Sequence, residues 1–329
     1  MDHNGMKRDT SGLVAVVVTY NRLPQLEQTL KRLLDTPAGT LSAVVVVDNA
    51  STDGTTPWLS QQDDARLDIV HLTENTGGAG GFAAGMRHAR DVYDPDWLVV
   101  MDDDARPAPA ALETFCAHPP QAWDAIAAAV YFPDGRICEM NRPSRNPFWH
   151  PGGIWRAVRQ GRDGFHLAPE LYDGTQTVPI DVTSFVGFFI SRKGVSLAGL
   201  PDAGLFLYGD DGLYTLGLSA AGGRIGFDPN IRFEHACSTF SDAQRGRFRP
   251  LWKVYYYHRN LLLLYRMAAG LWFWPALLLI VPKWLLKVRS HSGERRLFLR
   301  LMAGALRDGL LQRTDRTHSA VKALAEPRI

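Results

Sequence analysis

The chain has 329 residues, of which 46% are apolar and 21% charged, so it can bury a full core in one large or two ordinary domains. Its formal net charge of +2 is too small to indicate a nucleic-acid-binding protein. The acidic residues concentrate in the first two thirds, whereas the C-terminal part is rich in Arg and Lys. This asymmetry favours an anionic surface as a neighbour of the tail.

The cysteines and the N-terminus indicate a cytoplasmic protein. Cys116, Cys138 and Cys237 are odd in number, lie far apart and form no CxxC pair, which is typical of a reduced chain. Residues 1–5 read Met-Asp-His-Asn-Gly, and no apolar stretch of the signal-peptide type precedes the first expected strand. We therefore expect that the protein is not secreted.

The first half of the chain alternates strand and helix patterns. Unbroken apolar or β-branched runs predict strands at 13–19, 41–47, 68–72 and 97–101, and leucines at helical spacing predict a helix at 23–34. A further helix is expected at 81–90, behind a glycine-rich loop. This alternation predicts an α/β fold with a doubly wound sheet, whose ligands bind beyond the carboxyl ends of the strands.

Three consecutive carboxylates, Asp102, Asp103 and Asp104, directly follow the strand expected at 97–101. Because side chains alternate along a strand, Asp102 and Asp104 would point the same way and Asp103 elsewhere. Two converging carboxylates suit Mg²⁺ or Mn²⁺, which usually bind through one or two carboxylates and substrate phosphates. The alternative is a solvated acidic turn. Since the other polar segments also follow expected strands, the metal site is favoured, with a diphosphate substrate.

A glycine-rich segment at 75–81 precedes the helix expected at 81–90. Its backbone can approach a ligand closely and offer N–H groups at a helix N-terminus. It has neither the Walker sequence nor the position of the dinucleotide fingerprint, so a standard ATP or NAD site is disfavoured. A flexible turn is the alternative reading.

Several segments carry a family resemblance. The sequences VVVTYNR at 16–22, VDNASTDG at 47–54 and MDDD at 101–104 together resemble the GT-A-fold inverting glycosyltransferases of family 2. Bacterial galactofuranosyltransferases in particular resemble this chain in the segments 75–82, 101–107, 186–189, 205–211 and 257–260. The similarity covers about residues 13 to 265. Related rhamnosyltransferases share much of the pattern.

The resemblance implies a role for individual residues. Asp102, Asp104 and His235 match metal ligands, and Asp211 matches the general base, with Asp210 as the runner-up. Residues implied to hold the nucleotide sugar are Thr19, Tyr20, Asp48, Asn75, Gly77, Gly78, Asp103, Phe188 and Phe189. Thr19, Tyr20 and Asp48 match base and ribose contacts, whereas Phe188 and Phe189 match aromatic residues of the sugar and acceptor pocket. Tyr208-Gly209 departs from the Trp or Glu that often begins the family's acidic motif, which affects the acceptor contacts.

Inverting sugar transfer needs these residue types for chemical reasons. It is a single displacement at the anomeric carbon, in which the acceptor hydroxyl loses a proton while a nucleoside diphosphate departs on the opposite face. One general base and one Lewis acid suffice. No covalent sugar–enzyme intermediate is required.

The C-terminal region has a different pattern. The apolar segment 271–282 is short and broken by prolines, unlike a span of about 20 apolar residues. Apolar and basic residues typical of an interfacial helix follow one another here: Trp272, Trp274, Trp284, Lys283, Lys287, Arg289, Arg295, Arg296 and Arg300. The alternative is a buried helical hairpin packed on the catalytic domain or on another subunit.

The sequence thus predicts a GT-A catalytic domain at 1–240 and an α-helical, membrane-proximal region at 241–329. The expected function is metal-dependent inverting transfer of galactofuranose from its UDP donor to a cell-envelope glycan, with a polyprenyl-linked acceptor at the inner face of the membrane. Rhamnosyl transfer from a dTDP donor is one alternative, and a non-catalytic nucleotide-sugar-binding scaffold is another. A nucleotidyltransferase is disfavoured, since 19–22 does not resemble a triphosphate loop. The chain is also compatible with an oligomer.

Overall fold

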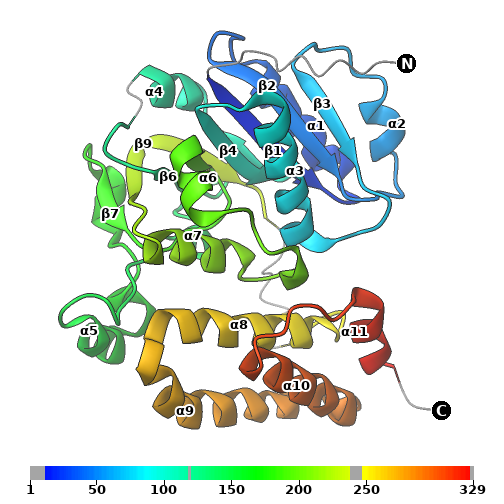
Figure 1. The fold of residues 1–329 in the computed structure, drawn as a ribbon, viewed down its shortest axis with the longest axis vertical. Helices are drawn as coiled ribbons and strands as arrows, with labels where there is room; N and C mark the ends of the chain where they lie inside the picture. Colours follow the sequence, from blue (N-terminus) through cyan, green and yellow to red (C-terminus); the bar gives the residue numbers. More distant parts are fainter. Residues whose placement is uncertain (1–11, 118–119, 238–246, 327–329) are drawn as a thin grey trace.

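The computed structural model describes residues 12–117, 120–237 and 247–326. Within these residues the strands form one nine-stranded sheet of order β3-β2-β1-β4-β8-β6-β9-β5, and β7 pairs with β9. Figure 1 shows the sheet and its flanking helices above a separate layer of helices. Residues 1–5, from which the absence of a secretion signal was predicted, lie outside the described residues.

The first half of the sheet is parallel, and it confirms the predicted α/β alternation. β1 pairs in parallel with both β2 and β4, and β2 pairs in parallel with β3. Every residue of β1 is buried, as expected for a β-branched strand covered on both faces. The elements of this half are β1 (Leu13–Thr19), α1 (Leu23–Leu34), β2 (Leu41–Asp48), α2 (Thr55–Leu59), β3 (Leu67–His71), α3 (Gly77–Tyr93) and β4 (Trp97–Asp102).

The second half makes the sheet mixed rather than doubly wound throughout. β8 lies antiparallel between β4 and β6, and β9 pairs in parallel with β6 and antiparallel with β5 and β7. The elements of this half are β5 (Ala105–Pro107), α4 (Ala111–Ala117), β6 (Ala125–Tyr131), α5 (Gly153–Gln160), β7 (Val178–Ile180), β8 (Phe188–Ser191), α6 (Arg192–Ala198), α7 (Asp210–Ala220) and β9 (Ile225–His235).

Helices cover both faces of the sheet, and two apolar cores result. On one face β1 packs through Val16 against Phe82 and Met86 of α3, with α6 and α7 in the same cluster. On the other face β1 packs through Val17 against Leu26 of α1, with α2 and α4 beside it. The alternating side chains of each strand thus contribute to both cores.

The glycine-rich segment is not the loop that was predicted. Gly77 to Gly81 form the first turns of α3, which begins at Gly77. A Cβ at Gly81 would lie 2.4 Å from Cγ1 of Val18, and one at Gly85 would lie 2.5 Å from Cγ1 of Val16. The glycines therefore let α3 approach β1 closely, and this packing need was not visible in the local sequence.

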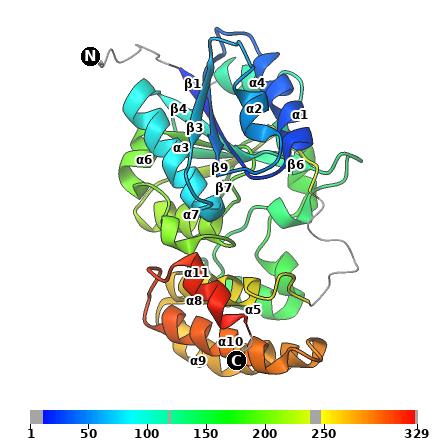
Figure 2. The ribbon, with the colours of Figure 1, turned by 90° about the vertical axis from the view of Figure 1, so that its right-hand side faces the viewer.

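The C-terminal helices form a layer with its own apolar core below the sheet domain (Figures 1 and 2). They are α8 (Lys253–Ala269), α9 (Phe273–Leu286), α10 (Arg295–Leu310) and α11 (His318–Leu324). α8 packs against α7 of the sheet domain. The predicted domain boundary at 240/241 falls within 238–246, outside the described residues.

Of the residues predicted to face a membrane, Trp284 is buried in this layer and Lys287 is half-buried against it. Trp284 is buried, packs edge-on to His258 at 5.0 Å and stacks on Tyr265. The ammonium group of Lys287 lies over the ring of Tyr257 at 5.1 Å from its centroid, and burial lowers its pKa. The prediction was wrong for Trp284, because a linear pattern of Trp and Lys does not show which face of a helix packs.

Candidate active site

The polar ends of three neighbouring strands lie side by side at one edge of the sheet. In the register of the parallel strands, Thr19 of β1 is opposite Asp48 of β2, and Val18 of β1 is opposite Asp102 of β4. The motifs that follow these strands, far apart in the sequence, therefore share one site at the carboxyl ends.

Asp102, Asp104 and His235 converge beside the sheet edge. β5 pairs antiparallel with β9 and sets Ala105 opposite His235, which brings the imidazole to the acidic turn. Nε2 of His235 lies 3.1 Å from Oδ1 of Asp104, and one ligand atom from each of the three residues lies within 4.8 Å of the others. Two carboxylates and an imidazole are a donor set that fits Mn²⁺.

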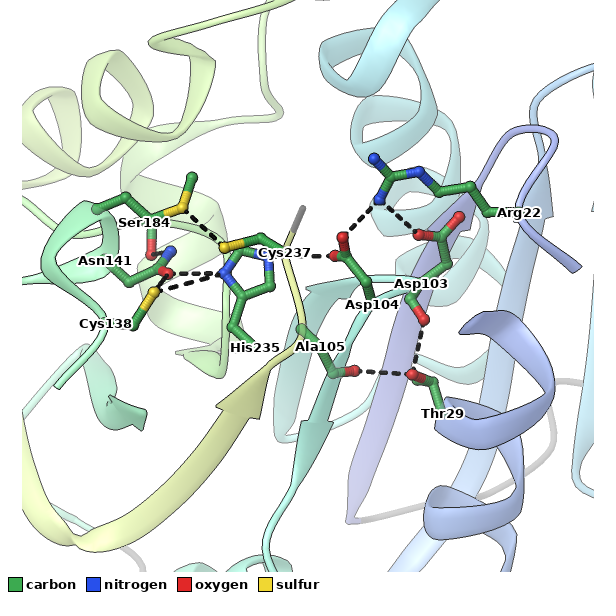
Figure 3. Close-up of polar contacts among 11 residues, drawn as sticks. Arg22, Thr29, Asp103, Asp104, Ala105, Cys138, Asn141, Ser184, His235 and Cys237 are labelled. Carbon is green, nitrogen blue, oxygen red and sulfur yellow. Dashed lines mark hydrogen bonds and ion pairs between the residues drawn. The ribbon is translucent and has the colours of Figure 1, made fainter. Parts of the chain in front are cut away.

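A buried network behind His235 fixes the orientation of its ring (Figure 3). Nδ1 of His235 lies 2.7 Å from Oδ1 of Asn141. Nδ2 of Asn141 donates to Oγ of Ser184 at 2.8 Å, so the amide oxygen is left to accept from the imidazole. This bond places the proton on Nδ1 and presents Nε2 toward Asp104, as expected for a metal-binding histidine.

Two cysteines also reach His235. Sγ of Cys138 lies 3.9 Å from Nδ1 of His235, and Cys237 belongs to the same cluster. All three cysteines of the chain are free thiols. The proximity of Cys138 and Cys237 is not visible in the sequence, because one follows β6 and the other follows β9.

Asp103 lies in the turn after β4 and is not part of the Asp102–Asp104–His235 cluster. Its Oδ2 accepts from the hydroxyl of Thr19 at 2.8 Å. Arg22, which the sequence reasoning did not single out, donates to Asp104 at 2.5 Å and lies 3.4 Å from Asp103. The hydroxyl of Thr29 holds the backbone of the acidic turn by donating to the carbonyl oxygens of Asp103 and Ala105.

The pKa values of this cluster reflect crowded, buried charge. Burial, with repulsion from Asp104, raises the pKa of Asp102 to about 7, and burial raises the pKa of Asp103 to about 6. Burial also acts on Asp104, but the hydrogen bond and charge of His235 outweigh it and hold the pKa of Asp104 below its usual value. Burial opposes protonation of His235, yet Asp104 raises its pKa to about 10. A cation at this place would stabilise the ionised carboxylates.

The proposed nucleotide residues occupy the neighbouring strand ends. Asp48 is buried and accepts from the hydroxyl of Thr56 at 2.5 Å and from the backbone N–H of Ser51 at 2.9 Å. Burial opposes ionisation, but these bonds hold the pKa of Asp48 below its usual value. Tyr20 is exposed beyond the end of β1. An ionised Asp48 can accept a hydrogen bond from a base N–H.

The N-terminus of α3 borders the acidic centre. Oδ1 of Asn75 accepts from the N–H of Gly77 at 2.8 Å. Gly77 has a φ of +73°, and a Cβ there would lie 2.0 Å from the carbonyl oxygen of Phe206. A Cβ at Gly78 would lie 4.0 Å from Oδ2 of Asp210. The glycines thus let the backbone of α3 meet the segment that leads into the acidic pair of α7.

Asp210 and Asp211 begin α7 and differ in what they face. Burial and repulsion from Asp211 raise the pKa of Asp210 well above its usual value, and Asp102 adds to that repulsion. Asp210 is therefore close enough to Asp102 for the two charges to repel. Burial also raises the pKa of Asp211, whose Oδ1 accepts from the N–H of Gly212 at 2.6 Å.

A residue of the helical layer supports this acidic pair. Nδ2 of Asn260 in α8 lies within 3.0 Å of the carbonyl oxygens of Leu205, Leu207 and Tyr208. Arg259 donates to the carbonyl oxygens of Gly204 and Leu205 at 2.8 and 3.0 Å. The segment 257–260 carried part of the family resemblance, but its supporting role is visible only in the fold.

The prediction that Phe188 and Phe189 line the sugar pocket is wrong. Both side chains are 0% exposed. Phe188 belongs to one core and packs edge-on to Tyr214, and Phe189 belongs to the other and stacks on Phe115 at 4.2 Å. They are core residues because β8 lies inside the sheet, between β4 and β6.

Comparison with known proteins gives consistent results. Residues 14–177, about half of the chain, match the model of glycosyl transferase family 2. The galactofuranosyltransferase GlfT1 of Mycolicibacterium smegmatis is 29% identical over 236 residues, which are 70% of this chain and 72% of the relative.

Two solved structures share the fold. One is TarS of S. aureus in complex with UDP-GlcNAc, with a TM-score of 0.56 and 15% identity over 95% of this chain and 83% of that one. The other is a mannosyltransferase from Pyrobaculum calidifontis in complex with GDP-Man and Mn²⁺, with a TM-score of 0.51 and 19% identity over 98% of this chain and 82% of that one. With the sequence match and the acidic strand-end site, these similarities identify the chain as a glycosyltransferase of family 2.

Proposed function

We propose that the protein is a metal-dependent inverting galactofuranosyltransferase with a UDP-galactofuranose donor. The single observation that carries the metal-dependent mechanism is the convergence of Asp102, Asp104 and His235 at the strand ends, next to Asp48 on one side and Asp210–Asp211 on the other. The sugar is inferred from the similarity to a galactofuranosyltransferase over 70% of the chain.

The donor diphosphate would bind at the acidic centre. Asp102, Asp104 and His235 would hold Mn²⁺ or Mg²⁺, and the mannosyltransferase neighbour was solved with Mn²⁺. The ion supplies positive charge that stabilises the leaving diphosphate. Arg22, which already pairs with Asp104, adds a fixed positive charge at the same place. Asp48, Thr19 and Tyr20 would contact the nucleoside, and Asn75, Gly77 and Gly78 would border the sugar.

Asp211 would act as the general base. In a single displacement the base and the leaving group lie on opposite sides of the anomeric carbon, so the base must stand away from the metal. Asp210 is the carboxylate that faces Asp102 and Gly78, which leaves Asp211 as the better candidate. Burial raises the pKa of Asp211, which strengthens it as a proton acceptor at neutral pH.

The acceptor would be a polyprenyl-linked glycan at the inner face of the cell membrane. The segment Lys253–Ser290 is long and apolar enough to cross a membrane by length and composition, and 11% of its most apolar window is buried. The chain turns back between α8 and α9, and the 14 residues of α9 extend only about 21 Å. This is shorter than the hydrocarbon core of about 30 Å, so we infer that α9 lies along the membrane surface.

Calorimetry with purified protein tests the donor and the metal together. The titrants are UDP-galactofuranose, UDP-galactopyranose and dTDP-rhamnose, each with Mn²⁺ and with a chelator. We expect metal-dependent preference for UDP-galactofuranose. Preference for dTDP-rhamnose would retain the mechanism and replace the sugar, whereas no binding of any donor would contradict the proposed reaction.

A further inference from the structure

The short helix α5 exposes an apolar stripe although it lies far from the C-terminal membrane-proximal region in the sequence. Trp155 and Val158 are each 71% exposed, and Ile154 is exposed beside them. These three positions share one face of a helix, since residues three and four apart are neighbours. Trp149, just before the helix, is exposed as well.

α5 is held in place by backbone packing rather than by this stripe. Gly153 is buried, and a Cβ there would lie 2.4 Å from the carbonyl oxygen of Pro147. A Cβ at Gly164 would lie 2.3 Å from the carbonyl oxygen of Arg156. The close backbone contacts at Gly153 and Gly164 hold α5 in place, and its large apolar side chains are exposed.

The surroundings of the stripe are basic. The segment 145–168 contains the arginines Arg145, Arg156, Arg159 and Arg162 and one acidic residue, Asp163, which pairs with Arg142 at 3.0 Å. Arg156 and Arg159 are exposed on the same helix as Trp155 and Val158. An aromatic and aliphatic stripe flanked by arginines has the chemistry of a helix that lies in the interfacial region of an anionic bilayer.

The segment that leads into α5 is bonded to the corner where α8 turns into α9. The buried amide of Asn146 donates to the carbonyl oxygen of Ala268 near the end of α8, at 2.9 Å. Directly after this point Trp272 is 62% exposed, and Leu278 and Leu279 on α9 are 76% and 78% exposed. Figures 1 and 2 both show α5 beside α8, on the side of the molecule that carries α9.

We propose that α5 and the exposed side of α9 form one docking surface for an anionic phospholipid bilayer. The surface comprises Trp155 and Val158 of α5, Trp272 at the corner, and Leu278 and Leu279 of α9, with Arg156 and Arg159 contacting lipid phosphates. Two separate contacts restrict how the enzyme tilts on the membrane, which a single helix does not. The inference deepens the proposed membrane location and uses no residue of the catalytic centre.

Vesicle sedimentation of the full chain tests the proposal. The vesicles are pure phosphatidylcholine and a mixture with phosphatidylglycerol, and the variants are Trp155→Ser with Val158→Ser, Arg156→Gln with Arg159→Gln, and Leu278→Ser with Leu279→Ser. We expect the wild type to prefer the anionic vesicles. The apolar α5 variant should bind them at least about 10-fold more weakly, and the arginine variant should lose most of the preference for anionic lipid.

Controls separate lipid contact from folding and from catalysis. Leu197→Ser changes an exposed leucine on α6 and should bind vesicles like the wild type, and Trp155→Phe, which keeps an interfacial aromatic residue, should retain most of the binding. Melting temperature and UDP binding should not change in any variant.

Wild-type vesicle binding by the apolar α5 variant would overturn the proposal, and so would absence of vesicle binding by the wild type. Dissociation of a wild-type dimer by the α5 variant would instead assign the stripe to a protein interface. Donor binding is measured in a separate experiment. Its failure would contradict only the proposed reaction and not the proposed membrane surface.

Discussion

At the scale of single residues, the centre is organised by where each carboxylate points. Asp102 and Asp104 cluster with His235, whereas Asp103 bonds Thr19, and Arg22 contacts both Asp103 and Asp104. The grouping of Asp102 with Asp104 agrees with the expected pattern, but β4 ends at Asp102 and the turn that follows it, not strand geometry, places Asp103 and Asp104. The contacts of Arg22 and Asn141 could not be predicted, because their partners lie 82 and 94 residues away in the chain.

We expect different roles for the two carboxylates that begin α7. Asp211→Asn should lower kcat by about 10²- to 10⁴-fold, the usual contribution of a general base, while UDP binding with Mn²⁺ stays close to the wild type because the side chain keeps its volume. Steady-state kinetics and calorimetry check this. The matched variant Asp210→Asn should instead change metal-dependent donor binding. Parallel loss of UDP binding and turnover in Asp211→Asn would place Asp211 in the donor site.

Asn141 should control metal affinity without touching the ion. Asn141→Leu removes the acceptor for Nδ1–H of His235 and should weaken Mn²⁺ binding by about 10- to 100-fold, as for other partners of metal-binding histidines. Electron paramagnetic resonance of free Mn²⁺ measures this without turnover. Asn141→Asp retains an acceptor oxygen and should bind more tightly than Asn141→Leu. Equal affinity of Asn141→Leu and the wild type would exclude the orienting role.

The raised pKa values predict an unusual pH dependence of the metal-free protein. Asp102 and Asp103 have folded-state pKa values of about 7 and 6, above the usual 3.8, and His235 is raised from 6.5 to about 10. The folded state therefore binds more protons than the unfolded state, so these groups reduce stability as pH rises from about 4 to 10. Bound Mn²⁺ would relieve the repulsion between the carboxylates. Mn²⁺ should therefore raise Tm more at pH 8 than at pH 5.5. A Mn²⁺ effect on Tm that is largest at pH 5.5 would contradict this assignment.

At the scale of elements, glycines decide how α3 sits on the sheet. The pattern at 75–81 indicated a loop with backbone available to a ligand, but α3 already begins at Gly77. Gly81 and Gly85 face β1 at contact distance. A short stretch of sequence shows that glycine is present, whereas the structure shows which backbone or side chain approaches it.

Alanine substitutions distinguish packing glycines from ordinary helical ones. Gly85→Ala would bring a Cβ within 2.5 Å of Val16 and 2.8 Å of Val47, so it should reduce the free energy of unfolding by about 1–3 kcal/mol. Gly217→Ala in α7 meets no atom within 4 Å in the described part of the chain and should be neutral or stabilising by up to about 1 kcal/mol. Denaturant unfolding measures both. Equal stabilities of the two variants would refute the close packing of α3 on β1.

At the scale of the whole molecule, the helical layer takes part in building the active site. Asn260 and Arg259 of α8 bind the backbone of 204–208, which leads directly into Asp210 and Asp211. The proposed catalytic domain at 1–240 therefore depends on the proposed helical region at 241–329 for the position of its acidic pair.

Loss of this connection should affect both stability and turnover. Asn260→Ala removes the side-chain donor to the carbonyl oxygens of Leu207 and Tyr208, which should reduce the free energy of unfolding by about 1–3 kcal/mol and lower kcat as the acidic pair loses its support. Denaturant unfolding and kinetics measure the two effects. Asn230→Ala, which removes an exposed asparagine bonded to Thr175, is the control. A wild-type kcat in Asn260→Ala would show that α8 does not position the pair.

The sequence by itself determined the α/β alternation, the parallel half of the sheet and the acidic turn at its edge, because these depend on periodicities of a few residues. Only the tertiary structure decided that β8 runs inside the sheet and buries Phe188 and Phe189, that Trp284 is buried, and that Asn141 and Asn260 support residues far along the chain. Strand order and helix packing depend on contacts between distant segments. Local pattern cannot specify those contacts, since each strand or helix face is compatible with several neighbours until the whole chain has folded.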